Sequence, residues 1–339
     1  MQKRRLLLIV LALGILIVWR QLHKEDEAKV IHLTGTTMGV VPYSIKYIDM
    51  AGRDYQKQID SILVDFNNSL STYIPSSEIS RFNARDTVTY ETPYLMPILN
   101  ISQEIYKKSY GAFDPTIGPL VNAWGFGPEK KLHLDSAFID SLKQKIGFEK
   151  VFFDKKIATK QTGVYLDFSA TAKGYAVDVI ADYIYEQGIR NFMVEIGGEV
   201  VCRGKNNSET YWKIGIEKPE VSPERGQLFA TTFIKNTALA TSGNYRNYYE
   251  EGGRIISHTI SPFTGYSIRH NLLSASIYAP NCALADGYAT ACMVLGLEKS
   301  IQMIEENPEL EGFLIFSDEN GKLNYYGSEK IMSSIEILK

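Results

Sequence analysis

The chain has 339 residues, of which 45% are hydrophobic and 22% charged, and its formal net charge is -3. This composition is that of a globular protein long enough for one large domain or two smaller ones. The charge balance excludes the polybasic composition of typical nucleic-acid-binding proteins, so no nucleic-acid partner is expected. The three cysteines lack Cys-x-x-Cys spacing, and their odd number argues against a disulfide framework.

The N-terminus predicts export and membrane attachment. Basic residues at positions 3–5 precede Leu6–Trp19, a run without a polar side chain. Such a pattern is typical of an export signal or signal-anchor. As a helix the run would span about 21 Å, which is shorter than a bilayer core of about 30 Å. No small-x-small cleavage site and no lipid-attachment cysteine follows, so residues 1–29 are interpreted as an uncleaved or poorly cleaved anchor and tether. The alternative is a buried N-terminal helix.

Residues 30–339 form the body of the protein. The first half of this body shows mainly helical periodicity. A strand is expected at Tyr43–Met50, and a hydroxyl-rich loop at Ser71–Glu78. Apolar residues recur at helical spacing, and Gly111 and Gly147 act as stop signals. These patterns predict helices over Asp54–Leu70, Tyr94–Tyr110 and Ser136–Ile146.

From Val151 onward, short strands separated by Gly and Asn dominate, interrupted by helices at Ala170–Gln187 and Cys282–Leu297. The strands are expected at Val151–Phe153, Val164–Phe168, Phe192–Glu195, Val200–Arg203, Trp212–Glu217, Phe229–Ile234, Arg254–Ile260, Leu273–Tyr278 and Phe313–Phe316. Strands and helices do not alternate regularly, which favours an α+β fold over a doubly wound sheet. Residues 205–237 contain two prolines and are expected to include an exposed loop.

The most informative run is Asp167–Asp178, which reads Asp-Phe-Ser-Ala-Thr-Ala-Lys-Gly-Tyr-Ala-Val-Asp. It predicts a strand that turns through small residues into a helix start, where Lys173 is placed. Free backbone N–H groups, the positive end of the helix and a lysine together favour a bound phosphate. The alternative is an ordinary strand-helix corner with a surface lysine.

Four further segments offer side chains for a ligand site. Tyr73 lies in the hydroxyl-rich loop, and Asp114 lies in the turn-dense segment Gly111–Leu120. His258 stands at a strand end before a Pro/Gly turn, where a histidine can accept a proton near neutral pH. Asp286 and Thr290 are four apart on a predicted helix, so their oxygens face the same way.

Each of these residues also has a structural interpretation. Asp286 could be a solvated or helix-capping acid, His258 a surface strand residue, Tyr73 a packing residue, and Asp114 part of a common turn. Taken together, they predict a site for Mg²⁺ and a pyrophosphate, because hard oxygen ligands suit Mg²⁺. Soft ligands at suitable spacing are missing from the sequence, so zinc or copper is not expected.

Ten segments in order resemble the ApbE family, the FAD:protein FMN transferases. The matching residues are Gly35–Met38, Ser71–Tyr73, Ser77–Glu78, Arg81–Asn83, Phe113–Pro119, Asp167–Asp178, Glu195–Glu199, Ala240–Asn244, His258–Gly265 and Ala285–Thr290. The resemblance implies that FAD is split at its pyrophosphate with Mg²⁺. FMN is then joined to a Thr or Ser hydroxyl of an acceptor protein and AMP is released.

The resemblance also implies roles for particular residues. The FAD contacts would be Met38, Tyr73, Ala112, Phe113, Asp114, Asp167, Lys173, Thr259 and Ile260. Mg²⁺ would lie between the backbone carbonyl of Ala170 and the side chains of Asp286 and Thr290, with Ala289 adjacent. His258 would be the base for the acceptor hydroxyl. The expected location is a bacterial inner membrane, with the body on the periplasmic side.

Three positions depart from the family pattern: Ser169 where Gly is frequent, Ser261 where Asp is usual and Gly287 where Ala is usual. Ser261 removes a charge and puts any metal-binding role of that position in doubt. Two other functions remain open: a Mg²⁺-dependent FAD diphosphatase and a non-catalytic flavin-binding protein. Tyr73 resembles the residue of transferring members more than that of hydrolysing ones.

Overall fold

The computed structural model describes residues 29–128, 131–219, 226–244, 248–251 and 254–338. The predicted anchor therefore lies outside the described residues, apart from Lys29. Within the described part of the chain, no helix combines the length and apolarity needed to cross a bilayer.

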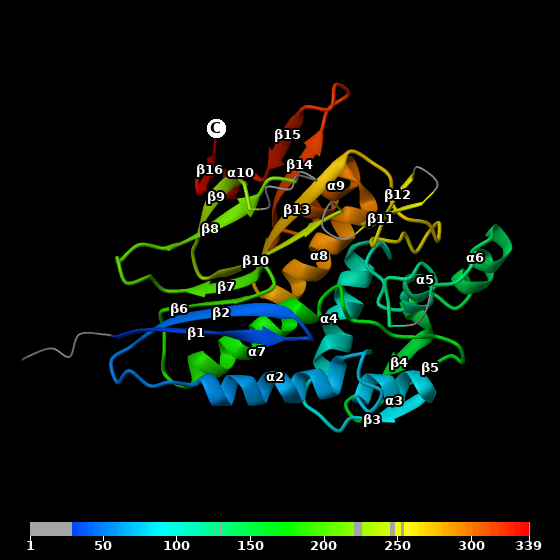
Figure 1. The fold of residues 1–339 in the computed structure, drawn as a ribbon, viewed down its shortest axis with the longest axis horizontal. Helices are drawn as coiled ribbons and strands as arrows, with labels where there is room; N and C mark the ends of the chain where they lie inside the picture. Colours follow the sequence, from blue (N-terminus) through cyan, green and yellow to red (C-terminus); the bar gives the residue numbers. More distant parts are fainter. Residues whose placement is uncertain (1–28, 129–130, 220–225, 245–247, 252–253, 339) are drawn as a thin grey trace, which may run out of the picture.

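An eight-stranded sheet forms the centre of the molecule, and each neighbouring pair in it is antiparallel. Its strands, in spatial order, are β1 (Lys29–Thr37), β2 (Val41–Asp49), β6 (Phe192–Ile196), β7 (Glu199–Arg203), β10 (Thr237–Gly243), β13 (Leu272–Ala279), β14 (Glu311–Ser317) and β15 (Leu323–Gly327). The antiparallel sheet with its flanking helices confirms the α+β prediction (Figure 1).

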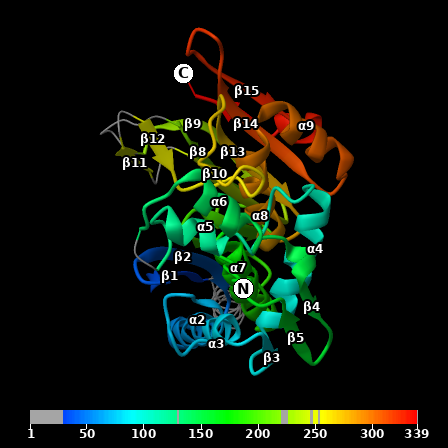
Figure 2. The ribbon, with the colours of Figure 1, turned by 90° about the vertical axis from the view of Figure 1, so that its right-hand side faces the viewer.

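The central strands are buried on both faces because alternate side chains point to opposite sides of a strand. In β10, Ala238 and Ala240 belong to the main helix-covered core, whereas Leu239 belongs to a second core. This second core lies under a three-stranded sheet made of β8 (Trp212–Glu217), β9 (Leu228–Ile234) and β16 (Ile335–Ile337). The molecule therefore has a layer on each face of the large sheet (Figure 2).

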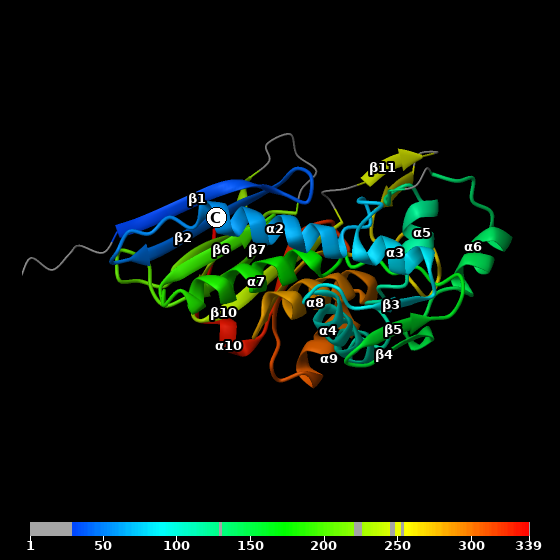
Figure 3. The same ribbon diagram turned by 90° about the horizontal axis from the view of Figure 1, so that it is seen from below.

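The helices α7 (Ala172–Glu186) and α8 (Cys282–Leu295) cover the main core and contact each other, and α2 and α4 pack outside them (Figure 3). The other described helices are α2 (Gln56–Leu70), α3 (Glu78–Ala84), α4 (Leu95–Lys108), α5 (Gly118–Ala123), α6 (Ser136–Lys143), α9 (Leu297–Glu306) and α10 (Glu329–Met332), with a 3₁₀ turn η1 (Phe148–Lys150). Two small sheets complete the fold: β3 (Thr87–Thr89), β4 (Val151–Phe153) and β5 (Ile157–Lys160) form one, and β11 (Tyr248–Glu251) and β12 (Arg254–Ser257) the other.

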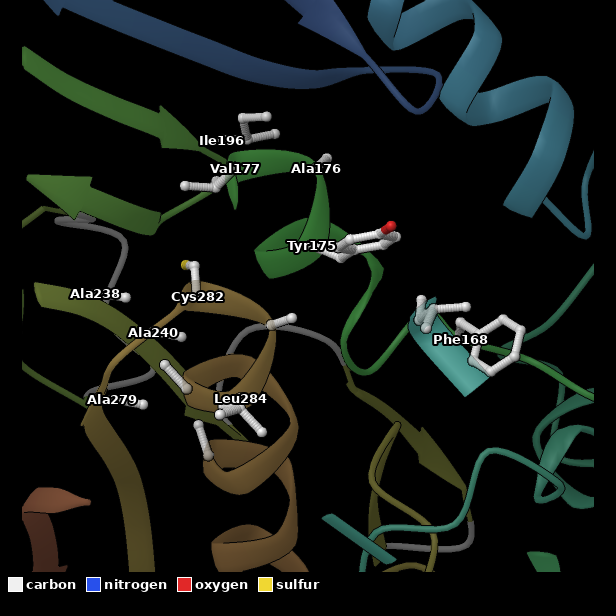
Figure 4. Packing of buried hydrophobic residues seen from close by; sticks show 14 of the residues in the cluster. Phe168, Tyr175, Ala176, Val177, Ile196, Ala238, Ala240, Ala279, Cys282 and Leu284 are labelled. Carbon is white, nitrogen blue, oxygen red and sulfur yellow. The ribbon is translucent and has the colours of Figure 1, made fainter. Parts of the chain in front are cut away.

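Helix α8 is almost entirely buried, and small residues allow its close packing. A Cβ on Gly287 would come within 2.4 Å of Ile105 Cδ1 on α4. The departure from alanine at Gly287 therefore makes room for a neighbouring side chain. Figure 4 shows the start of α8, with Cys282 and Leu284, next to the alanines of the adjacent strands.

The predicted strand at Val164–Phe168 is wrong. This segment joins no sheet, because its hydrogen bonds go to a side chain and to a loop. Leu166 N–H donates to Asn83 Oδ1, Asn83 Nδ2 donates to the Leu166 carbonyl, and Asp167 N–H donates to the Pro115 carbonyl. The Asn83 side-chain amide takes the place of a neighbouring strand, and the spacing of apolar residues cannot predict such a partner.

The helix predictions are confirmed with small shifts at their ends, but several elements were not predicted. The strands β1 and β10 and the helices α3 and α9 are the largest of these. The strand predicted at Arg254–Ile260 is shorter, because β12 ends at Ser257 and only a single bridge joins Ile260 to Ser267.

Candidate active site

Helix α7 begins directly after a tight turn that an aspartate closes. Ser169 N–H donates to Asp167 Oδ1 at 2.9 Å. Thr171 N–H and Ala172 N–H donate to the Phe168 carbonyl at 2.9 and 2.7 Å. The predicted turn into a helix start is therefore present, although the strand that was expected to precede it is not.

The first turns of α7 and α8 are locked together. Thr171 Oγ1 donates to the Ala283 carbonyl at 2.8 Å, and Gly174 N–H donates to Asp286 Oδ2 at 3.0 Å. A Cβ on Gly174 would lie only 2.2 Å from the carbonyl oxygen of Cys282. The glycine is therefore required for the close approach that brings Asp286 to the start of α7.

A cavity of about 430 Å³ lies where the α7 turn, α8 and several loops meet. Twelve of the residues singled out from the sequence line this cavity: Tyr73, Ala112, Phe113, Asp114, Asp167, Ala170, Lys173, His258, Thr259, Ile260, Asp286 and Thr290. Because these residues come from segments far apart in the chain, their convergence is a property of the fold.

Met38 and Ala289 do not line this cavity. Met38 lies at the tip of the β1–β2 hairpin with a φ of 48°, and it borders a second cavity of about 520 Å³ between this hairpin and α2. Ala289 is fully buried in α8, next in sequence to the cavity-lining Thr290. A direct ligand contact by either residue stays a prediction.

Asp286 lies in a strongly charged part of the cavity. Its side chain is buried, and its Oδ1 lies 3.8 Å from Lys173 Nζ. Burial raises the pKa of Asp286, and the nearby Lys173 opposes this shift. For Lys173, burial lowers the pKa, but the attraction of Asp286 and Glu199 outweighs it, so the net pKa of Lys173 is raised and the ammonium is retained.

Thr290 lies one helical turn after Asp286, and both line the cavity, as their spacing predicted. The Thr290 and Ser242 hydroxyls are 3.3 Å apart, so Thr290 already takes part in a polar contact across to β10. Together with the cavity-lining Ala170, these residues offer a carboxylate, a hydroxyl and a backbone carbonyl.

This donor set fits a hard cation that keeps part of its hydration or takes further oxygens from a phosphate. Magnesium sites commonly use one or two carboxylates together with substrate phosphates. In the part of the chain that the structure describes, no group of three or more His, Cys, Asp or Glu residues forms a metal cluster.

His258 and Tyr73 belong to the same cavity but differ in surroundings. The His258 ring makes an edge contact with Phe126, at a centroid distance of 6.3 Å. Tyr73 is 65% exposed, so its ring is available for contact with a ligand or partner. The turn after His258 is closed by a hydrogen bond from Thr264 N–H to Ser261 Oγ at 3.3 Å. Ser261 therefore stabilises the turn and does not line the cavity.

The structure also shows cavity residues that were not singled out from the sequence. The most notable is Glu199, a buried acid that pairs with Lys173 at the first position of β7. Others are Gly197, Thr241, Ser242 and Gly243, and Ser169, which departs from the family pattern, lines the cavity as well. The signal for Glu199 was the Gly197–Gly198 pair before it, since both glycines have positive φ and form a tight hairpin turn.

Sequence comparisons support a shared family. A model of the ApbE family matches residues 35–314. The FAD:protein FMN transferase of Haemophilus influenzae is 38% identical to this chain, covering 88% of it and 89% of the relative. The protein of the same description from Vibrio cholerae is 37% identical and covers 90% and 92%, respectively.

Solved structures give the same result for the fold. The flavin transferase ApbE from Vibrio cholerae superimposes with a TM-score of 0.81 at 36% identity, covering 91% of this chain and 99% of that one. The flavinyl transferase ApbE of Pseudomonas stutzeri in its apo form has a TM-score of 0.80 at 31% identity, covering 91% and 97%.

Proposed function

The chain belongs to the ApbE family, and from this premise we propose that it splits FAD at its diphosphate with Mg²⁺, attaches FMN to an acceptor protein and releases AMP. It is a transferase that moves flavin from FAD to an acceptor protein.

One observation carries the proposal most strongly. A single cavity contains a lysine at a helix start, an acid and a hydroxyl one turn apart on a second helix, and a histidine on a third segment. Lys173 supplies positive charge for a diphosphate, and Asp286 and Thr290 supply hard oxygens. His258 supplies a group that accepts a proton near neutral pH.

The reaction joins the acceptor oxygen to the phosphorus on the FMN side of FAD. The bond between that phosphorus and the bridging oxygen breaks. AMP leaves with the bridging oxygen and the electron pair of the broken bond. His258 takes the proton of the acceptor hydroxyl. Most of the rate can come from positioning and charge, since phosphoryl transfer needs little covalent chemistry from the protein.

Ala170, Asp286 and Thr290 would hold Mg²⁺, which would neutralise developing charge on the phosphate oxygens. Lys173 would bind the diphosphate at the start of α7, where backbone N–H groups also favour anions. Tyr73 would contact the flavin from the cavity rim, and Asp114 and Asp167 would fix polar groups of FAD. Met38, Ala112, Phe113, Thr259 and Ile260 complete the proposed FAD contacts.

The test is incubation with FAD, Mg²⁺ and a candidate acceptor domain, followed by intact-mass analysis of the acceptor. The expected result is a covalent gain of FMN less water together with free AMP. His258→Ala should lower the rate by about 10²–10⁴-fold through loss of a general base. Asp286→Ala should abolish it. Free FMN with an unmodified acceptor would instead indicate an FAD diphosphatase, and bound FAD without AMP a flavin-binding protein.

We also propose that residues 1–28 attach the protein to a bacterial inner membrane, with the described body on the periplasmic side. The basic positions 3–5 before the apolar run support this location.

A further inference from the structure

Among the described residues, Glu199 is a buried acid whose side chain has one hydrogen-bond partner. It is 3% exposed, and its Oε1 accepts a hydrogen bond from Lys173 Nζ at 2.5 Å. Its other oxygen, Oε2, is buried and has no hydrogen-bond partner within the described chain. A buried carboxylate needs a counter-charge, so Glu199 depends on Lys173.

Lys173 lies between two carboxylates. Its Nζ is 2.5 Å from Glu199 Oε1 and 3.8 Å from Asp286 Oδ1. The other Asp286 oxygen, Oδ2, already accepts from Gly174 N–H. Asp286 Oδ1 is therefore the oxygen for which the Lys173 ammonium and a divalent cation compete, and the shorter contact to Glu199 decides where the ammonium stays.

We propose that Glu199 is a positioning residue that holds the Lys173 ammonium away from Asp286 and keeps Asp286 Oδ1 available to Mg²⁺. It thereby also fixes Lys173 at the α7 helix start, where the diphosphate binds. This inference rests on the proposed function, because it concerns the same metal and the same diphosphate.

Replacing Glu199 by Gln tests whether the Lys173 ammonium and the cation compete for Asp286 Oδ1. An amide cannot compensate the ammonium, so Lys173 would turn to Asp286 and oppose a cation there. The expected effect of Glu199→Gln is a metal affinity weaker by about 10–100-fold, the range seen when residues that orient metal ligands are changed. The substitution also removes a negative charge, which by itself weakens cation binding in any background.

A double-mutant cycle separates these two effects. In Lys173→Met protein no ammonium can move, so Glu199→Gln should weaken metal binding by less than about threefold. The Lys173→Met protein itself should bind the metal at least as tightly as the wild type. This single variant tests the inference even if Glu199→Gln fails to fold. If Lys173 merely stabilised the site, its removal would lower the metal affinity.

The experiment is calorimetric titration of the full chain and each variant with Mn²⁺ as the probe, first without FAD and then with FAD present, alongside thermal melts. Glu195→Gln is the matched control, because Glu195 lies on the same hairpin and its Oε1 accepts from Gly198 N–H at 2.7 Å, outside the cavity. It should bind Mn²⁺ like the wild type. An equal loss from Glu199→Gln in both backgrounds, or weaker binding in Lys173→Met, would overturn the inference. Failure of the wild type itself to bind Mn²⁺, both alone and with FAD present, would overturn the metal part of the proposed function, and this inference with it.

Discussion

Asp114 shows how one residue of the cavity makes the stability of the fold depend on pH. Its carboxyl is 7% exposed, and Oδ1 accepts from Thr116 N–H at 2.8 Å and Thr116 Oγ1 at 2.6 Å. Burial raises the pKa of Asp114 to about 6, although the bonds from Thr116 oppose the shift. The folded state therefore holds this proton more tightly than the unfolded chain, and the stability contributed by the protonated acid is lost as pH rises from about 4 to about 6.

Asp114→Asn should remove this pH dependence, because the amide oxygen can still accept both bonds from Thr116 while carrying no charge. Relative to the wild type, the variant should gain up to about 3 kcal/mol in the free energy of unfolding between pH 4 and pH 7. Urea unfolding at several pH values measures the difference. A difference in the free energy of unfolding between the two proteins that stays constant across this pH range would contradict the raised pKa.

The helices α7 and α8 clamp each other through their N-terminal halves. Asp286 of α8 accepts from the Gly174 N–H of α7, and Asp178 of α7 accepts from the Cys282 and Ala283 N–H groups of α8 at 2.7 and 2.8 Å. Each helix thus supplies an acid to the N-terminal amides of the other, where a negative charge is favoured. The clamp orients the helix that bears Asp286 and Thr290.

Asp178→Ala should lower the free energy of unfolding by about 1–3 kcal/mol, because two amides at the start of α8 lose their acceptor. Asp182→Ala is the control one turn along the same helix, where the side chain is exposed, and it should change stability by less than about 0.5 kcal/mol. Chemical denaturation of both variants makes the comparison. Equal stability of the two would show that Asp178 does not hold the helices together.

At the scale of the whole molecule, the sequence predicted what is local and periodic. The apolar spacing indicated α2, α4, α7 and α8, and the Asp286–Thr290 spacing correctly predicted a shared face. Partners from distant segments were harder to foresee. Strand β10 reads Thr-Ala-Leu-Ala-Thr-Ser-Gly and lacks the bulky residues typical of strands, because its neighbours α8 and β13 leave little space. From the sequence, Glu199 was indistinguishable from an ordinary hairpin residue, because its contact with Lys173 exists only in the folded protein.

The proposed tether makes a prediction for the complete protein. The chain shortened to residues 29–339 keeps β1, which starts at Lys29 and pairs with β2 along its whole length. It should appear in the soluble fraction of cells and still flavinylate a soluble acceptor, whereas the full chain should sediment with membranes. Fractionation followed by immunoblotting distinguishes them, and a full chain found only in the soluble fraction would remove the anchor from the proposal.

The contact between Gly174 and the Cys282 carbonyl has a consequence for protein engineering. Exchanging a helical glycine for alanine ordinarily strengthens a helix by about 1 kcal/mol. Here the added methyl group would lie 2.2 Å from a backbone oxygen, which cannot swing aside as a side chain would. Replacing Gly174 by alanine, a substitution commonly used to raise thermostability, would therefore destabilise this protein, because it would push α7 and α8 apart. These two helices carry the Lys173, Asp286 and Thr290 side chains of the cavity.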